Sequence, residues 1–197
     1  MTTPAVLYLH GFLSSPASAK GRLLADEARR LGWDCLAPDW NLPPREVDAL
    51  LRNLMRARSP ETLRKTLVVG SSLGGFYALR LAQEFGLPAA LVNPCLEPWE
   101  FVVDSLGEQK VFGTERVVQV KASFADDFRA LAREVPPLPV SPQKLLLLLS
   151  TKDEVLDHRA ALEAFRDSPR LLSVGDDHRM QRFAEYLPAA AAFLRAQ

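Results

Sequence analysis

The residue with the clearest chemical potential is a serine in the pentapeptide Gly70-Ser-Ser-Leu-Gly74, which fits the pattern Gly-x-Ser-x-Gly. An apolar run at 67–69 precedes it, and a helical pattern starts at Leu73 and lasts to Gly86. A sharp turn between a strand and a helix is strained, and it lifts the serine at its apex clear of the sheet edge. Ser72 is therefore the candidate nucleophile, with the Leu73 N–H directed into the same space.

A serine hydroxyl is a weak nucleophile unless a base accepts its proton, and the sequence offers three histidines for this role. His178 follows the last expected strand in the loop Gly175-Asp-Asp-His178, where it can reach the turn at Ser72 from above. His10 ends the first expected strand and is expected to hydrogen-bond the loop backbone, whereas His158 starts a helix and is expected to be exposed. We predict that His178 is the base.

The imidazole of a catalytic histidine needs an acid that fixes its tautomer. Asp153 follows the preceding expected strand in Ser150-Thr-Lys-Asp-Glu-Val155 and is the predicted acid. Glu154 and Asp157 remain alternatives, although both are also suited to capping the next helix or facing solvent. The order nucleophile, acid, base along the chain is typical of α/β-hydrolases.

The first expected strand ends in His10-Gly-Phe12, and Gly11 permits a tight turn there. If this turn faces Ser72, the N–H groups of Phe12 and Leu73 form an oxyanion hole, in which each donor contributes on the order of 3 kcal/mol. The alternative interpretation is a simple turn at the end of a strand.

Unalternating apolar runs separated by amphipathic helices predict an α/β fold with a parallel sheet covered on both faces. We expect a six-stranded, mostly parallel sheet in the order 2-1-3-4-5-6, which brings the ends of strands one and three together. In the helix after Ser72, Arg80 and Glu84 are expected to face solvent. The expected strands are 5–10, 35–38, 67–69, 89–93, 144–150 and 171–174. The expected helices are 19–31, 45–56, 73–86, 157–166 and 179–195, the last bent at Pro188.

The length of 197 residues predicts one domain, 1–197, with an insertion at about 96–142 that forms a cap over the site. Within the insertion, 97–107 is expected to be helical, 111–120 extended and 123–135 helical, before the proline-rich stretch 136–142. The substrate is expected to place its acyl group among apolar residues near the strand ends or in the cap. The candidates are Phe12, Leu13, Trp40, Leu96, Trp99 and Phe101.

The composition narrows the class of protein further. Lys plus Arg and Asp plus Glu are both 24, and a net charge of zero gives no electrostatic footprint for nucleic acid or an anionic membrane. Cys35 and Cys95 lie in apolar surroundings, which disfavours a zinc site or a disulfide framework and fits a reducing compartment. Since neither a signal peptide nor a membrane span is evident, we expect a cytoplasmic protein. We expect neither a metal nor an organic cofactor, and the oligomeric state stays open.

Four segments together carry a resemblance to a known family: 10–16, the turn at Ser72, Val92-Asn-Pro94 and 153–157. They resemble the small bacterial YqiA-like esterases, a compact branch of the α/β-hydrolase superfamily, and the resemblance covers nearly the whole chain but is weak across the cap. It implies a Ser72, Asp153 and His178 triad that hydrolyses small-molecule acyl esters or thioesters.

The chain also departs from that family around the base. Lys152 stands where relatives usually have glycine, Asp176-Asp177 replaces a usual Gly-Asn pair, and Arg179-Met180 replaces small or aromatic residues. These differences put the polarity around His178 in question, while the three triad residues are all present.

Two other functions compete with hydrolysis. Gly70-x-Ser72-x-x-Gly75 approaches the dinucleotide fingerprint, but a serine replaces the glycine that admits the pyrophosphate, and Asn93-Pro94 lacks the acid that holds a ribose. The stronger alternative is an α/β-hydrolase fold without catalytic activity that serves as a binding or interaction module. The acidic Asp176-Asp177-His178 loop is its main support.

Overall fold

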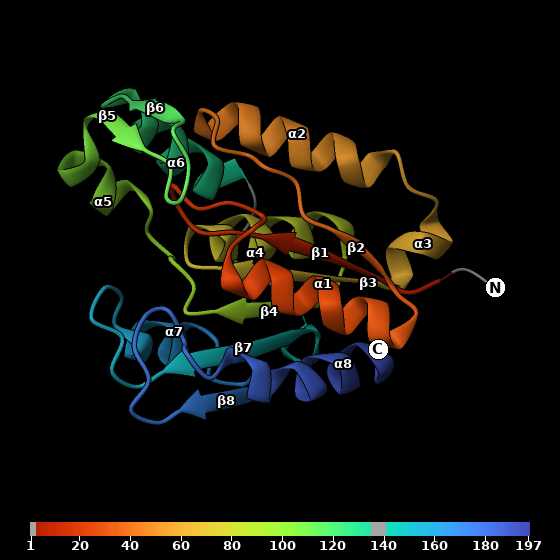
Figure 1. Cartoon of the computed structure of the whole chain (residues 1–197). Helices are drawn as coiled ribbons and strands as arrows, with labels where there is room; N and C mark the ends of the chain where they lie inside the picture. Colours follow the sequence, from red (N-terminus) through yellow and green to blue (C-terminus); the bar gives the residue numbers. More distant parts are fainter. Residues whose placement is uncertain (1–2, 135–140) are drawn as a thin grey trace.

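A parallel sheet forms the centre of the computed structural model, which describes residues 3–134 and 141–197 (Figure 1). All neighbouring strands pair in parallel, which confirms the predicted six-stranded parallel sheet. The order is β2-β1-β3-β4-β7-β8, in which the six expected strands lie in the expected order 2-1-3-4-5-6, and only the labels of the last two differ because two further strands, β5 and β6, precede them in the chain. The strands are β1 (Ala5–Leu9), β2 (Asp34–Leu36), β3 (Thr66–Ser71), β4 (Ala89–Val92), β7 (Leu145–Ser150) and β8 (Arg170–Ser173).

Both faces of the sheet are buried, which explains the unbroken apolar runs of the strands. Leu7 and Leu9 point into one core cluster, whereas Val6 and Tyr8 on the same strand point into the other. Helices α1 (Ala19–Leu31) and α8 (Leu187–Arg195) cover the second cluster and lie on the same side of the sheet in Figure 1. Helices α2 (Pro44–Arg56), α4 (Leu73–Phe85), α6 (Ser123–Glu134) and α7 (His158–Ala164) contribute to the first.

Two short helical segments differ from the prediction. Helix α3 (Pro60–Arg64) was not predicted, and the side chain of Ser59 caps it by accepting a hydrogen bond from the Thr62 N–H. The predicted helix 179–195 is wrong in its first half, where a 3₁₀ helix η3 (Phe183–Tyr186) precedes α8. Pro188 lies in the first turn of α8. A proline there lacks only an N–H that has no helical partner, so it starts the helix rather than bending it.

The prediction that Arg80 faces solvent is wrong, because its side chain is only 6% exposed. Its Nε and one terminal nitrogen each lie 2.9 Å from Oδ1 of Asp48 on α2. The other terminal nitrogen donates to the Leu131 carbonyl on α6. Helical periodicity identified the face of α4 that contacts the sheet, but it carried no information on a second layer of helices packed on the outer face.

The insertion forms a small subassembly at the upper left of Figure 1, above the carboxyl ends of the central strands. A short helix α5 (Trp99–Val102) and a 3₁₀ turn η1 (Val103–Ser105) lead into an antiparallel hairpin of β5 (Gly107–Lys110) and β6 (Val117–Val120), followed by α6. The predicted helix 97–107 is thus too long, since Gly107 adopts a φ of 92° at the start of β5. The extended region is also shorter than the expected 111–120, and positions 135–140 lie outside the described residues.

The described part of the chain contains no disulfide, no metal-binding cluster and no membrane-spanning helix. Within it, Cys35 and Cys95 are free thiols, and burial raises the pKa of Cys95 to about 12. No three His, Cys, Asp or Glu side chains in the same ranges come together as a metal site needs. Among these residues, none of the helices has the length and apolarity to cross a membrane.

Candidate active site

Ser72 occupies the turn between β3 and α4 with φ 53° and ψ −120°, a conformation that is strained for any residue with a side chain. The turn is tight on both sides, because a Cβ built on Gly70 would lie 2.3 Å from the Gly74 carbonyl oxygen. A Cβ on Gly74 would likewise lie 2.1 Å from the carbonyl oxygen of Leu9. The Ser72 N–H donates to the Val92 carbonyl at 3.0 Å, so the turn is also tied to β4.

The structure brings the serine, histidine and aspartate singled out above into one hydrogen-bonded chain. His178 Nε2 lies 3.1 Å from Ser72 Oγ, and His178 Nδ1 lies 2.8 Å from Asp153 Oδ2 and 2.9 Å from Oδ1. The Asp153 side chain is only 1% exposed, and its Oδ1 also accepts the N–H groups of Val155 at 2.9 Å and Leu156 at 2.8 Å. Three side chains from the ends of β3, β7 and β8 therefore converge on one point.

The charge of Asp153 determines the tautomer of the histidine. Burial alone raises the pKa of Asp153, but the hydrogen bonds from His178, Leu156 and Val155 outweigh it and hold the pKa below its usual value. Because the carboxylate only accepts, Nδ1 of His178 carries the proton that it donates to Asp153. In the neutral ring Nε2 is then the acceptor, directed at the Ser72 hydroxyl.

The alternative acids occupy other roles. One carboxylate oxygen of Glu154 accepts the backbone N–H of His178 at 3.0 Å. Asp157 is the N-cap of α7 and accepts the Arg159 N–H at 2.9 Å. Glu154 thus holds the loop that carries His178, and Asp157 caps a helix.

The other two histidines contact different groups. His10 is fully buried, its Nδ1 donates to the Gly11 carbonyl at 2.8 Å as predicted, and its ring stacks on Trp40 at 4.5 Å. Burial lowers the pKa of His10, which keeps the ring neutral near pH 7. His158 is the first residue of α7 and is half-buried rather than exposed as expected.

An acidic side chain holds the loop around His178 in shape. Asp176 accepts the Ser173 hydroxyl and the Gln181 N–H, both at 2.9 Å, and the Arg182 N–H at 3.1 Å. Burial raises the pKa of Asp176, yet these hydrogen bonds outweigh it and lower the pKa below its usual value. The unusual acidic residue before the base is therefore an internal brace of the loop.

Asn93 makes a second connection to the base that the sequence analysis did not identify. Its Nδ2 donates to the His178 carbonyl at 3.0 Å and to Ser150 Oγ at 2.9 Å. Its Oδ1 accepts the Ser150 N–H at 2.7 Å. The Asn-Pro pair after the fourth expected strand was a signal of this role, because a buried amide at a strand end needs partners on neighbouring strands.

Backbone strain is concentrated at this edge of the sheet. Among the described residues, the non-glycine positions with positive φ are Leu13, Ser72, Asn93 and Met180, which lie in the loops after β1, β3, β4 and β8. Such conformations cost of order 1–3 kcal/mol each and persist where the surrounding structure enforces them. Strain at four converging loops is typical of an active site.

The loop after β1 contacts the Ser72 turn. A Cβ built on Gly11 would lie 3.4 Å from Ser72 Cβ, so the two backbones are in contact. The N–H groups of Phe12 and Leu73 donate no hydrogen bond to another group in the described ranges. Two free backbone donors flanking a serine provide what an oxyanion hole requires.

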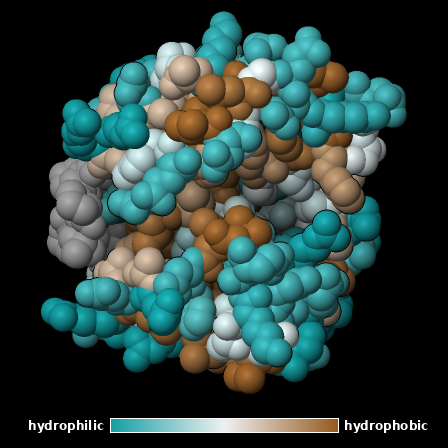
Figure 2. Space-filling model, turned by 90° about the vertical axis from the view of Figure 1, so that its left-hand side faces the viewer, coloured by the Kyte–Doolittle hydropathy of each residue, from teal (hydrophilic) through white to brown (hydrophobic). Residues whose placement is uncertain are grey.

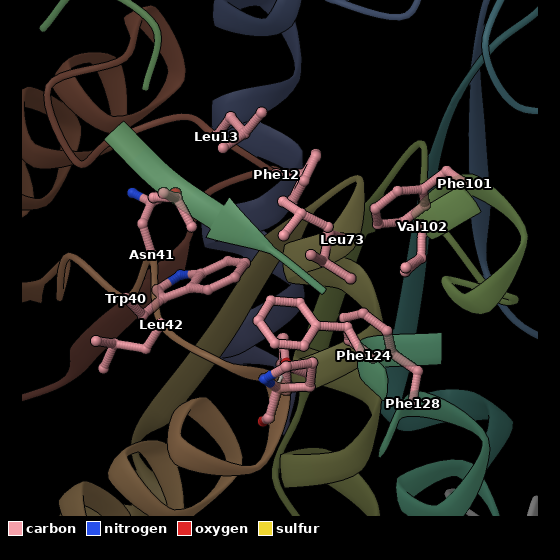
Figure 3. Close-up of a pocket in the computed structure, with 14 residues that line it drawn as sticks. Phe12, Leu13, Trp40, Asn41, Leu42, Leu73, Phe101, Val102, Phe124 and Phe128 are labelled. Carbon is pink, nitrogen blue, oxygen red and sulfur yellow. Dashed lines mark hydrogen bonds between the residues drawn. The ribbon is translucent and has the colours of Figure 1, made fainter. Parts of the chain in front are cut away.

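An apolar pocket of about 400 Å³, including the part open to solvent, adjoins this site (Figure 3). Four of the predicted substrate contacts line it, whereas Leu96 and Trp99 are absent from its lining and pack against the core. Phe124 and Phe128 were not predicted, although their i, i+4 spacing on α6 was a visible signal of a shared face. The lining consists of Phe12, Leu13, Trp40, Asn41, Leu42, Pro44, Leu73, Tyr77, Phe101, Val102, Val118, Val120, Phe124 and Phe128.

Figure 2 shows the molecule from the side to which the strand arrows of Figure 1 point. Hydrophobic residues gather in the hollowed centre of this face, and hydrophilic residues surround them. The catalytic candidates follow the carboxyl ends of the strands, as is general for ligand sites in parallel sheets.

Comparisons with solved structures show that the chain has the α/β-hydrolase fold. A protein from Xanthomonas campestris pv. campestris, described as belonging to the alpha/beta hydrolase superfamily, superposes with a TM-score of 0.64 at 21% identity, and all of both chains is covered. Mouse alpha/beta hydrolase domain-containing protein 10 has a TM-score of 0.71 at 18% identity, with 99% of this chain and 90% of the other covered. At such identities the likeness establishes the fold, and the activity needs separate support.

The family follows from the sequence itself. Residues 5–195 match the Uncharacterised protein family (UPF0227), and the chain belongs to that family. A UPF0227 protein of Shewanella sp. (strain MR-7) is 25% identical over 194 residues, covering 95% of this chain and 98% of the relative. The resemblance to the YqiA-like branch is thereby confirmed.

Proposed function

We propose that this protein is a serine hydrolase that cleaves carboxylic esters or thioesters of small molecules through an acyl-enzyme. The observation that carries the proposal is the continuous chain from Ser72 Oγ through both nitrogens of His178 to the buried carboxylate of Asp153. The serine at its end is held in a strained turn beside two free backbone donors. In this proposal the domain spans 1–197, and the segment of about 96–142 is its cap.

Acylation begins at Ser72. His178 Nε2 takes the hydroxyl proton while Oγ attacks the carbonyl carbon, and Asp153 stabilises the imidazolium that forms. The N–H groups of Phe12 and Leu73 donate to the developing oxyanion. The C–O or C–S bond of the substrate then breaks, and His178 gives its proton to the leaving alcohol or thiol.

Deacylation repeats the same steps with water. His178 takes a proton from a water molecule while the water oxygen attacks the carbonyl carbon of the acyl-enzyme. The second tetrahedral intermediate then collapses to the carboxylic acid. The proton returns to Ser72 Oγ, which restores the starting state. Neither half-reaction requires a group that the chain does not supply.

The competing interpretation is a binding module without catalytic activity. Its support was the acidic loop, but Asp176 braces that loop and leaves His178 directed at Ser72. The loop is therefore as well explained by hydrolysis, and the hydrogen-bonded serine favours hydrolysis.

The test compares two adjacent serines, using the hydrolysis of p-nitrophenyl butyrate. Ser72→Ala removes the proposed nucleophile, and we expect kcat/KM to fall by roughly 10⁴-fold or more. Ser71→Ala is the matched control, since Ser71 ends β3 and belongs to the same motif. It should retain most of the activity. Equal rates for the Ser72 variant and the unaltered protein would refute the proposal.

A further inference from the structure

We infer that the apolar pocket next to Ser72 is the acyl-binding site, and that it selects short, uncharged acyl groups. Helix α6 forms its end wall. The inference rests on the proposed function, because it specifies which acyl group the enzyme transfers. It draws on the position, lining, size and rigidity of the pocket.

The position of the pocket follows from two residues that line it. Phe12 and Leu73 both contribute to its wall, and their backbone N–H groups are the proposed donors to the oxyanion. A substrate whose carbonyl oxygen binds these donors has its carbonyl carbon at Ser72. Its acyl chain is then at the opening of the pocket, and burying that chain there removes apolar surface from water.

The lining determines the chemistry of the acyl group. Aromatic rings dominate it, with Phe12 and Phe101 at 4.9 Å between ring centroids and Phe101 and Phe128 at 6.3 Å. None of the residues that line the pocket carries a charged side chain. A carboxylate or ammonium on the acyl group would lose its hydration without gaining a partner, so the pocket excludes charged chains.

The size of the pocket limits the length of the chain. Its volume of about 400 Å³ includes the part open to solvent, and the space that a water-sized group can enter is only about 20 Å³. A group of the size of benzene needs a cavity of about 150 Å³, so a phenyl ring does not fit without moving the walls. A short chain therefore fills the space, whereas a longer chain meets the far wall.

The far wall is rigid because the inner face of α6 is fixed to the layer beneath it. Phe124 and Phe128 line the pocket from α6 and are buried. The buried Arg80 donates to the Leu131 carbonyl of the same helix and pairs with Asp48 on α2. Figure 3 shows Phe124 and Phe128 grouped on one side of the pocket and Leu13 on the opposite side.

Two partly exposed ion pairs also join α6 to α2. Arg45 on α2 binds Asp127 at 3.0 Å and Glu134 at 3.1 Å. With α6 held at both points, a longer acyl chain cannot move the wall without separating packed side chains.

The experiment is a chain-length series of p-nitrophenyl esters from acetate to dodecanoate, with benzoate and a hexanoate analogue ending in a carboxylate. In the unaltered protein, kcat/KM should be highest among acetate, propionate and butyrate, and it should fall by at least about tenfold by dodecanoate, because a long chain meets the packed wall. Benzoate should react more slowly than butyrate, and the carboxylate-ended ester should react about a hundredfold more slowly than hexanoate.

Two variants move the wall in opposite directions. Phe128→Ala should shift the optimum toward longer chains, and Val118→Phe should shift it toward acetate, because the first enlarges the pocket and the second fills it. Phe165→Ala is the matched control, since Phe165 is a buried core phenylalanine outside the lining. It should leave the optimum unchanged. If Phe128→Ala does not fold, Val118→Phe and the ester series on the unaltered protein still test whether this pocket binds the acyl group.

The outcomes separate the inference from the function on which it rests. An active protein whose kcat/KM stays flat or keeps rising to dodecanoate contradicts the assignment of the pocket. A Val118→Phe variant with an unchanged optimum contradicts it as well. Complete absence of turnover and of fluorophosphonate labelling at Ser72 would instead overturn the proposed hydrolase activity, and the inference with it.

Discussion

The two sides of Ser72 are held by different forces. On one side, the loops with Asp153, Asp176 and His178 are fixed by hydrogen bonds that backbone N–H groups donate to carboxylate side chains. On the other side, the pocket walls of Phe101 and Phe128 are fixed by packing of aromatic rings. Hydrogen bonds have defined directions, whereas packing is tolerant of direction and sensitive to volume.

This contrast suggests that the two sides have separate functions, one in positioning His178 and the other in selecting the length of the acyl group. Under the proposed function, the hydrogen-bonded side sets the position and tautomer of His178, so changes there should alter kcat and leave the preference for acyl length intact. The packed side would set the volume available to the acyl group, so changes there should shift that preference. Variants on the hydrogen-bonded side test this division, and we give them in order of expected effect.

The largest effect is expected from the base itself. His178→Ala should lower kcat by roughly 10³-fold or more, because Ser72 then loses the acceptor for its proton. His158→Ala should change kcat less than about twofold, since His158 begins α7 and does not contact Ser72. Steady-state hydrolysis of p-nitrophenyl butyrate measures both. Equal losses in the two variants would show that the base is misassigned.

An intermediate effect is expected from the residue that holds the backbone of the base. Asn93→Gly removes the donor to the His178 carbonyl and tolerates the φ of 42° at this position. We expect kcat to fall by roughly tenfold to a hundredfold with the optimum acyl length unchanged.

The control for Asn93→Gly is Ser150→Ala, which removes one hydrogen-bond partner of Asn93 but keeps the hydrogen bond from Asn93 to the His178 carbonyl. This variant should lose less activity than Asn93→Gly. A shift in the optimum acyl length of Asn93→Gly would break the proposed division between the two sides.

The smallest effect is expected from Asp176, which accepts hydrogen bonds within the loop around His178, and this effect depends on pH. Because the pKa of Asp176 is lower in the folded protein, its stabilising contribution is present above the unfolded pKa of about 3.9 and is lost as pH falls through the folded pKa. Asp176→Asn should therefore lower the free energy of unfolding by about 2 kcal/mol at pH 7. Urea unfolding at pH 7, 5 and 3 measures whether that difference shrinks below about pH 4. A difference independent of pH would contradict the role of the carboxylate charge.

The features predictable from the sequence were those governed by local sterics and strand periodicity. Gly70 is required by a contact with Gly74 within the same turn, so the pentapeptide indicated its own geometry, whereas Gly74 is required by the close approach of the Leu9 carbonyl on β1. The apolar strands located the sheet, and the parallel order then identified which loops meet at Ser72. This is why His178 and Asp153 could be selected before any contact was known.

The features that could not be predicted depend on contacts between distant segments. Arg80 looks like a surface residue on its own helix, and only the packing of α2 and α6 buries it. Leu96 and Trp99 are apolar residues of the insertion like Phe101, yet the path of the chain directs only Phe101 into the pocket. The bonds of Asn93 join β4 to the loop after β8, and no pattern within one segment encodes them.

The most direct test of the central claim is labelling with a fluorophosphonate, followed by intact mass and peptide mapping. We predict one adduct per chain at Ser72, absent from Ser72→Ala and formed much more slowly in His178→Ala. The Ser71→Ala variant should be labelled like the unaltered protein. A folded protein that forms no adduct, or forms it at a residue other than Ser72, would contradict the account.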